Sequence, residues 1–376
     1  MRRVNNKVFY NLVFFLYMCI TVVILIEVSF RLFVDLFPQP TKSIIKEAKR
    51  ISYSNLRVYG QGLAGGVAIL LPNDDKVDFM VLGDSFPGGT YVKKENRFPE
   101  VIAKLSNTVV ANLSVGSKGP PIYNRMLEVG VRYKPSIVLY CFFANDFIYE
   151  GELGANEYKE VLKRNLSINN TYKNLPNDRE YFLDELKTTD KLNNFRRKIT
   201  NHFVSFQIFK LLKQPSQNVT HVPYVFKDNY FAFSVKEYWD SIISWKNENV
   251  KSSLAINVKL IDQAKNFALQ NGMQMIVILI PSKEMVYGNI IQDEVVRKKI
   301  WTSYHHKTYK KFNVKLDELG IPWIDITEPL ISYAKQGYKL YFSIDGHFNE
   351  LGHQFSAEII YKYLKENNYF KPEFNS

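Results

Sequence analysis

The chain has 376 residues, of which 46% are hydrophobic and 23% charged, so it can bury a large core and is not an intrinsically disordered protein. Its 18 glycines and 15 prolines are ordinary in number and no internal repeat is present, which excludes collagen, coiled-coil and solenoid architectures. The net charge of +12 favours acidic partners, but no segment gathers Lys and Arg with interleaved aromatic residues, so no nucleic-acid partner is expected.

The first predicted element is a membrane-spanning helix. Val8–Ile26 is a run of 19 residues without a formal charge, and at about 1.5 Å per residue it nearly matches a hydrocarbon layer of about 30 Å. Arg2, Arg3 and Lys7 precede it, so the positive-inside rule places the N-terminus in the cytoplasm and the rest of the chain outside. A cleavable signal peptide is the alternative, but the long apolar run and the absence of an A-x-A pattern favour an uncleaved anchor.

Changes in composition divide the chain into four parts. We expect a cytoplasmic tail over 1–7, a signal-anchor helix over 8–30, a linker with an irregular lead-in or small edge hairpin over 31–75, and an exported domain over 76–376. An insertion rich in Asn, Lys and Tyr interrupts this domain at about 151–251. Insertions at the carboxyl ends of strands form the walls of ligand crevices, so this one either shapes a substrate site or contacts a partner.

Short apolar runs alternate with amphipathic segments in the exported domain. The expected strands are Val77–Leu82, Thr108–Leu113, Ser136–Phe143, Met273–Ile280 and Pro322–Ile326. The expected helices are Phe98–Leu105, Tyr123–Tyr133, Leu254–Gln270, Tyr304–Leu319 and Asn349–Asn367, with helical pieces of the insertion at Glu157–Lys163 and Phe203–Leu212. This alternation predicts an α/β domain with a parallel sheet covered on both faces.

The candidate catalytic residues lie at two strand ends. Ser85 follows the first strand, at the carboxyl edge of the sheet, and a serine hydroxyl needs a base that is itself oriented by a carboxylate. His347 and Asp345 lie between the fifth strand and the last helix, two residues apart, so the carboxylate can reach the imidazole. Asn349 and Gly352 are expected to begin the last helix, and His353 to face solvent or pack on it.

Four segments in this order resemble the blocks of the SGNH (GDSL-type) hydrolase superfamily. They are Gly83-Asp84-Ser85, Asn112 to Pro120, Ala144-Asn145-Asp146 and Asp345-Gly346-His347. Ser117 and Ala144 stand where the family commonly has glycine, and the last block is one residue tighter than the usual Asp-x-x-His. That spacing and the segment Ile280 to Tyr287 are similar to a membrane-anchored branch that includes polysaccharide O-acetyltransferases and esterases.

The resemblance implies a flavodoxin-like three-layer α/β/α sandwich with a five-stranded parallel sheet. It makes Ser85 the nucleophile and implies an oxyanion hole formed by the N–H of Ser85, the N–H of Gly116 or Ser117, and the Asn145 amide. Asp84 and Asp146, beside these residues, are expected to stabilise local turns.

The resulting hypothesis is a membrane-anchored, extracytoplasmic serine hydrolase or acyltransferase that acts on ester-linked acyl groups, chiefly acetyl, through an acyl-serine. A bacterial inner membrane facing the periplasm, or the cell surface, fits this topology, with cell-surface polysaccharide as substrate. A lipid esterase or phospholipase and an inactive glycan-binding or assembly scaffold are the alternatives. Neither a metal nor a cofactor is expected, because Cys19 and Cys141 lie in separate apolar runs and no Gly-rich phosphate loop follows the first strand.

Overall fold

The computed structural model describes residues 6–38, 41–58, 67–70, 77–116, 118–147, 203–206, 208, 221–301 and 304–370. The chain divides into two compact units. One comprises Met1–Leu56 with Thr189–Pro215, and the other comprises Arg57–Thr188 with Ser216–Ser376. Each unit is described by itself.

The first unit contains the expected apolar helix. Helix α1 (Asn6–Leu32) includes the segment Val13–Leu32, which is the one segment among the described residues long and apolar enough to cross a membrane. Most of its apolar side chains are exposed, including Phe14 and Leu25. These properties match those of a membrane anchor in length and composition, and they are equally those of a signal sequence.

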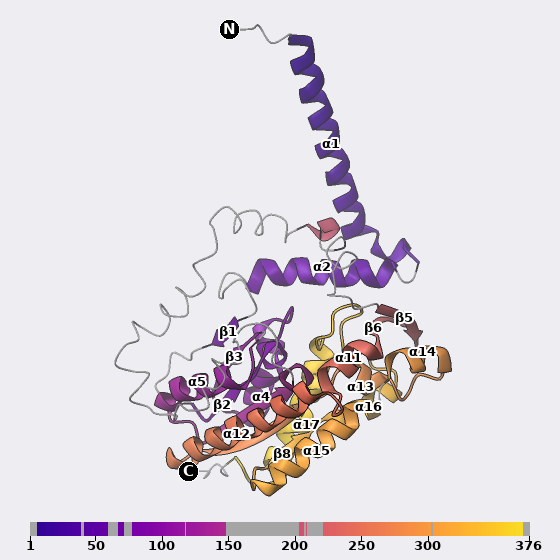
Figure 1. Cartoon of the computed structure of the whole chain (residues 1–376). Coiled ribbons are helices and arrows are strands. Elements are labelled where there is room, and N and C mark those ends of the chain that lie inside the picture. The colour runs from indigo at the N-terminus through magenta and orange to yellow at the C-terminus, as the bar shows by residue number, and fades with distance from the viewer. Residues whose placement is uncertain are drawn as a thin grey trace. The chain divides into compact units, whose positions relative to one another are not determined.

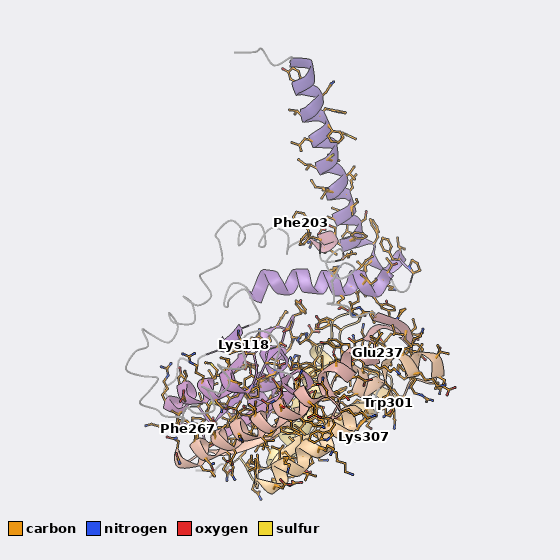
Figure 2. The ribbon with its side chains drawn as sticks, in the orientation of Figure 1. Lys118, Phe203, Glu237, Phe267, Trp301 and Lys307 are labelled. Carbon is orange, nitrogen blue, oxygen red and sulfur yellow. The ribbon has the colours of Figure 1, made fainter. Side chains whose placement is uncertain are left out.

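Glu27, near the end of α1, binds a second segment of the same unit. Its carboxylate forms an ion pair with Arg31 at 2.7 Å, as the four-residue spacing allows. The same carboxylate accepts hydrogen bonds from the backbone N–H groups of Val204 at 2.8 Å and Ser205 at 3.0 Å. These contacts satisfy backbone donors at a helical turn beside Phe203, which is labelled in Figure 2.

The lead-in before the sheet domain is more regular than expected. It contains a short 3₁₀ turn at Val34–Leu36, helix α2 (Thr41–Val58) and strand β1 (Val67–Leu70). The prediction of an irregular segment was wrong for α2, whose Ile45 and Ala48 lie three residues apart on one face and are fully buried. Strand β1 is an edge strand that pairs antiparallel with β3, so the edge position was correct but a local hairpin was not.

The second unit is built on a six-stranded sheet in the order β1-β3-β2-β4-β7-β8. Besides β1, its strands are β2 (Phe79–Leu82), β3 (Val110–Val115), β4 (Ile137–Phe143), β7 (Gln274–Ile280) and β8 (Trp323–Asp325). These last five are mutually parallel, which confirms the predicted sheet. Their order by chain position is the flavodoxin-like 2-1-3-4-5. Strands β2 and β4 are buried throughout, as their continuous apolar runs require.

Helices cover both faces of this sheet (Figure 1). Helix α4 packs with α17 on one face, while α12 packs with α5 and α15 on the other. Side chains of α12 such as Phe267, labelled in Figure 2, are buried in the core. The bounds of the helices are α4 Phe98–Ser106, α5 Pro120–Gly130, α12 Glu248–Gln270, α15 Tyr304–Glu318, α16 Thr327–Lys335 and α17 Glu350–Glu366. This arrangement follows from right-handed crossovers between parallel strands.

The insertion contributes a separate hairpin. Strands β5 (His221–Phe226) and β6 (Asn229–Ser234) form a two-stranded antiparallel sheet, followed by α11 (Lys236–Ile243). The helix expected at Glu157–Lys163 lies outside the described residues, and of Phe203–Leu212 only 204–206 and 208 are described as helical. Helix α12 begins at Glu248, so the expected end of the insertion at residue 251 falls inside a core helix.

Candidate active site

The nucleophile candidate stands on a sharp turn after β2. Ser85 opens α3 (Ser85–Gly88), and the buried carboxylate of Asp84 caps this turn by accepting from the Phe86 N–H at 2.9 Å. Gly83 permits the turn, because a Cβ there would lie 2.5 Å from Pro87 Cγ and 2.9 Å from Cys141 Cβ. The chain thus presents Ser85 at the carboxyl edge of the sheet, where ligand sites of such folds lie.

The structure brings Ser85, His347 and Asp345 together. The His347 Nε2 atom lies 2.6 Å from the Ser85 Oγ, and its Nδ1 lies 2.5 Å from the Asp345 Oδ1. The same carboxylate oxygen also accepts from the backbone N–H of His347 at 2.8 Å. This geometry places an imidazole between a hydroxyl and a carboxylate, as nucleophile activation requires.

The loop that carries His347 is held at both ends. Phe348 pairs with Tyr341 across a β-bridge, and its ring meets the Phe86 ring edge-on at a centroid distance of 4.9 Å. Asn349 caps α17 by accepting from the Gly352 N–H at 3.0 Å, as expected from the sequence. A Cβ on Gly352 would lie only 2.0 Å from the Leu340 carbonyl oxygen, so glycine allows this close approach.

The charges around the imidazole favour a strong base. Burial by itself lowers the pKa of His347, but the Asp345 carboxylate beside it and the Asp84 carboxylate nearby raise this pKa above its ordinary value. Burial raises the pKa of Asp345, but the facing imidazole and the hydrogen bonds from His347 bring it below its ordinary value. The His347 side chain is 25% exposed and that of Asp345 12%, so the imidazole is reachable from solvent while its carboxylate is largely shielded.

Of the residues expected to form an oxyanion hole, the structure describes Ser85, Gly116 and Asn145. Gly116 directly follows β3, and the N–H of Val115 donates to the Gly83 carbonyl at 2.8 Å, which holds this strand end beside the turn of Ser85. Asn145 follows β4 in the 3₁₀ turn Ala144–Phe147, is exposed, and donates from Nδ2 to Asp84 at 3.3 Å. Ser117 lies outside the described residues.

Asp84 and Asp146 stabilise turns, as predicted. Asp146 accepts from the backbone N–H of Phe143 at 2.9 Å and from the Tyr123 hydroxyl at 3.1 Å. Both carboxyls are buried, and burial raises the pKa of each, with the Asp84 charge adding to the shift at Asp146. They organise the turns that carry Ser85 and Asn145.

Of the two alternatives expected for His353, exposure to solvent was wrong. Its side chain is 1% exposed, its Nδ1 accepts from the backbone N–H of Phe98 at 3.3 Å, and its ring stacks on the Phe98 ring. Burial lowers the pKa of His353 to about 3, so the ring stays neutral. It joins α17 to the start of α4 rather than serving catalysis.

Three supporting residues were given no role from the sequence, although Asn112 and Lys283 lie within segments that carry the family resemblance. Asn112 donates from Nδ2 to the Pro87 carbonyl at 2.9 Å and to Glu100 at 3.3 Å, which ties β3 and α4 to the turn of Ser85. Burial raises the pKa of Glu100 to about 7. Lys283 opens helix α13 (Lys283–Tyr287) shortly after β7, is 2% exposed and faces the loop of Asp345. A lysine inside an apolar segment at a strand end was the available signal.

Comparison with known proteins gives one family match. Residues 243–374 match the model described as "SGNH hydrolase-like domain, acetyltransferase AlgX", a range that includes β7, Lys283, Asp345 and His347 but not Ser85. No protein with a curated description matches the sequence.

Two solved structures show a distant likeness. An esterase EstA from a Pseudoalteromonas species is 10% identical with a TM-score of 0.36, covering 79% of this chain and 100% of that one. A GDSL-like lipase from Bacteroides thetaiotaomicron is 8% identical with a TM-score of 0.35, covering 85% of this chain and 99% of that one. Scores this low add nothing to the argument. The family match covers residues 243–374, and together with the flavodoxin-like sheet and the ordered sequence blocks it supports an SGNH hydrolase-like domain in this chain.

Proposed function

We propose that the chain is a serine esterase or O-acyltransferase that carries an acyl group on Ser85. The observation that supports this most directly is the continuous hydrogen-bonded line from the Ser85 Oγ through His347 to Asp345, with distances of 2.6 and 2.5 Å. Hydrogen-bond contact between nucleophile and base, with the base oriented by a third group, is the geometric requirement for covalent acyl transfer.

In the proposed reaction, the His347 Nε2 removes the proton from the Ser85 hydroxyl as its oxygen attacks an ester carbonyl. The negative oxygen that forms is stabilised by the N–H of Ser85, the N–H of Gly116 or Ser117, and the Asn145 amide. Imidazolium then protonates the leaving alkoxide, which departs as an alcohol and leaves acyl-Ser85. In the second half, His347 removes a proton from the acceptor, which attacks the acyl-serine and releases the Ser85 oxygen with that proton restored.

The acceptor decides between the two activities. If water attacks acyl-Ser85, the protein is an esterase, and if a sugar hydroxyl does, it is an O-acyltransferase. The words "acetyltransferase AlgX" in the matching family model favour acetyl as the acyl group. The His347 side chain is 25% exposed, which is consistent with an acceptor that arrives from solvent.

We assign the reaction to the outer side of a membrane. Residues 8–30 would form an uncleaved anchor, residues 1–7 would stay in the cytoplasm, and residues 76–376 would act in the periplasm or at the cell surface. The apolar helix α1 and the basic residues before it support this topology. With its net charge of +12, the chain suits an acidic polysaccharide as substrate.

The experiment is mass spectrometry of the full-length protein in detergent after exposure to p-nitrophenyl acetate. Acetylation at Ser85, with release of nitrophenol, should disappear in Ser85→Ala and persist in Ser241→Ala, which alters an exposed serine on α11. If neither p-nitrophenyl acetate nor a fluorophosphonate modifies the wild type, the catalytic proposal is contradicted and the scaffold alternative takes its place.

A second assay identifies the acceptor. The acetylated enzyme is mixed with de-O-acetylated polysaccharide or with buffer alone, and the free enzyme is mixed separately with phospholipid vesicles that contain acetylated lipid. If acetyl-Ser85 is lost faster with polysaccharide than in buffer and the acetyl group appears on the sugar, the protein is a transferase. If acetyl-Ser85 is lost at the same rate in both, the result supports an esterase. Turnover of lipid ester alone would replace the polysaccharide by a lipid substrate.

A further inference from the structure

Lys283 has an unusual environment for a lysine. It is 2% exposed and follows the carboxyl end of strand β7, which lies between β4 and the edge strand β8. Its ammonium group faces four successive backbone carbonyl oxygens of one loop: Phe342 at 3.4 Å, Ser343 at 3.4 Å, Ile344 at 3.2 Å and Asp345 at 3.1 Å. The closest of these carbonyls belongs to the residue whose side chain orients His347.

Burial of this charge is compensated by its surroundings. An ammonium has three N–H donors, and the four carbonyl dipoles saturate them, which offsets a desolvation cost that buried lysines otherwise meet by losing their proton. The ring of Phe233 lies 5.8 Å from the Nζ and adds a cation–π contact. The Lys283 side chain can therefore stay charged while it is buried against the backbone of residues 342–345.

The neighbouring residues hold the same loop from another side. The buried Glu284 accepts from the backbone N–H of Ser234 in β6 at 2.7 Å. The N–H of Ala232 in the same strand donates to the carbonyl of Ser343 at 2.7 Å. Helix α13 and the β5–β6 hairpin thus form a common support for the segment that ends in Asp345.

We propose that Lys283 is a positioning residue, whose ammonium gathers the carbonyls of residues 342–345 so that Asp345 orients His347 toward Ser85. This inference rests on the proposed acyl-serine reaction. It assigns Lys283 no contact with the substrate. It also gives the β5–β6 hairpin of the insertion a role, because the hairpin braces the same loop.

The charge of Lys283 has a second effect. The titratable and charged groups that face His347, Lys283 or their loop are Asp345, Asp84, His353, Glu284, His221 and Lys339. The two carboxylates beside His347 raise its pKa, while the cation of Lys283 lowers it. Removing the cation while Asp345 stays in place should therefore raise the pKa of His347 further, because the opposing positive charge is gone.

The test compares Lys283→Met and Lys283→Gln in the full-length protein in detergent. Methionine removes both charge and donors, while glutamine keeps two N–H donors and removes only the charge. Lys298→Met is the control, because the Lys298 side chain is 74% exposed and pairs with Glu294 within helix α14 (Glu294–Ile300). We measure kcat and KM for p-nitrophenyl acetate, the pH profile of kcat/KM, and the ¹³C NMR titration of His347, assigned with His347→Gln.

For Lys283→Met we expect kcat to fall about 100-fold with KM nearly unchanged, since a small misplacement of a catalytic group costs about that much. Lys283→Gln should retain more kcat, because its amide still binds part of the loop. In Lys283→Gln, whose amide still binds part of the loop, the His347 titration and the acid limb of the profile should move to higher pH, because the opposing cation is gone. In Lys283→Met both should lie at lower pH than in Lys283→Gln, because Asp345, which raises the pKa of His347, is no longer held against it. Lys298→Met should match the wild type.

Two results would overturn the role of Lys283. One is wild-type kcat in Lys283→Met, and the other is a His347 titration at the same pH in Lys283→Met and Lys283→Gln, which would mean that Asp345 keeps its place without the donors of residue 283. The NMR titration does not depend on turnover. If the wild type proves inactive, the reaction proposal fails, while the titration still decides whether Lys283 controls the Asp345–His347 pair.

Discussion

The His347 Nε2 lies 2.6 Å from the Ser85 Oγ, although 262 positions separate the two residues. Ser85 follows the strand at the centre of the sheet and His347 precedes the last helix, so the contact forms only when the whole sheet is assembled. Catalysis by this pair would therefore depend on the complete fold of the second unit.

The base is expected to be indispensable. In His347→Gln the Ser85 hydroxyl loses its proton acceptor, and kcat should fall by about 10² to 10⁴-fold, the usual contribution of general acid–base catalysis. Steady-state turnover of p-nitrophenyl acetate and fluorophosphonate labelling at Ser85 measure the effect. His306→Gln, in α15, is the matched control, and labelling of His347→Gln at the wild-type rate would contradict the role of His347.

Activity should be lost as the pH falls through the pKa of His347. Only the neutral imidazole accepts the Ser85 proton, and Asp345 and Asp84 outweigh burial to raise this pKa above its ordinary value. The acid limb of kcat/KM should therefore lie at a higher pH than for an unperturbed histidine. An acid limb at a lower pH than that of an unperturbed histidine would contradict the conclusion that Asp345 and Asp84 raise the pKa of His347.

Asp345→Asn should slow the reaction strongly and shift its pH profile. Asparagine can still accept the backbone N–H of His347, but it lacks the charge that stabilises the imidazolium and fixes its tautomer. We expect kcat to fall by about 10³ to 10⁴-fold. Because the Asp345 carboxylate raises the pKa of His347, its loss should also move the acid limb of the kcat/KM profile to lower pH. Asp293→Asn, at the exposed cap of α14, should leave both unchanged.

Asn145→Ala tests the oxyanion donor. An interaction made in the transition state alone affects kcat more than KM, and loss of one such donor costs about 10² to 10³-fold in kcat. Because Asn145 is exposed and its amide reaches Asp84 at 3.3 Å, folding should be little affected. A rise in KM with unchanged kcat would instead indicate that Asn145 only binds substrate.

Gly352→Ala should destabilise the protein at the start of α17. The added Cβ would lie 2.0 Å from the Leu340 carbonyl oxygen, so the helix or the preceding loop must shift. Overpacking of this kind costs about 1–3 kcal/mol of unfolding free energy, measurable by chemical denaturation. Gly346→Ala is the stability control, since nothing lies within 4 Å of the position of its Cβ. Equal stability of the two variants would contradict the close packing at Gly352.

Much of the architecture was predictable because its signals are local. Continuous apolar runs predicted the five parallel strands, and amphipathic spacing predicted the helices between them. The same rule should have indicated α2, where Ile45 and Ala48 share a buried face, but its high proportion of polar residues obscured the pattern. The antiparallel pairing of β1 with β3 was not predictable, since edge pairing depends on tertiary contacts.

The amino-acid sequence alone determined the class of fold, the apolar N-terminal helix, and the candidates Ser85, Asp345, His347 and Asn145, because strand periodicity and short motifs are properties of neighbouring residues. Only the tertiary structure determined which residues the polar side chains contact. It put His353 in the interior against Phe98 and put the ammonium of Lys283 among the carbonyls of the Asp345 loop. Burial and partners of a polar side chain are set by segments far apart in the chain, and no local pattern records them.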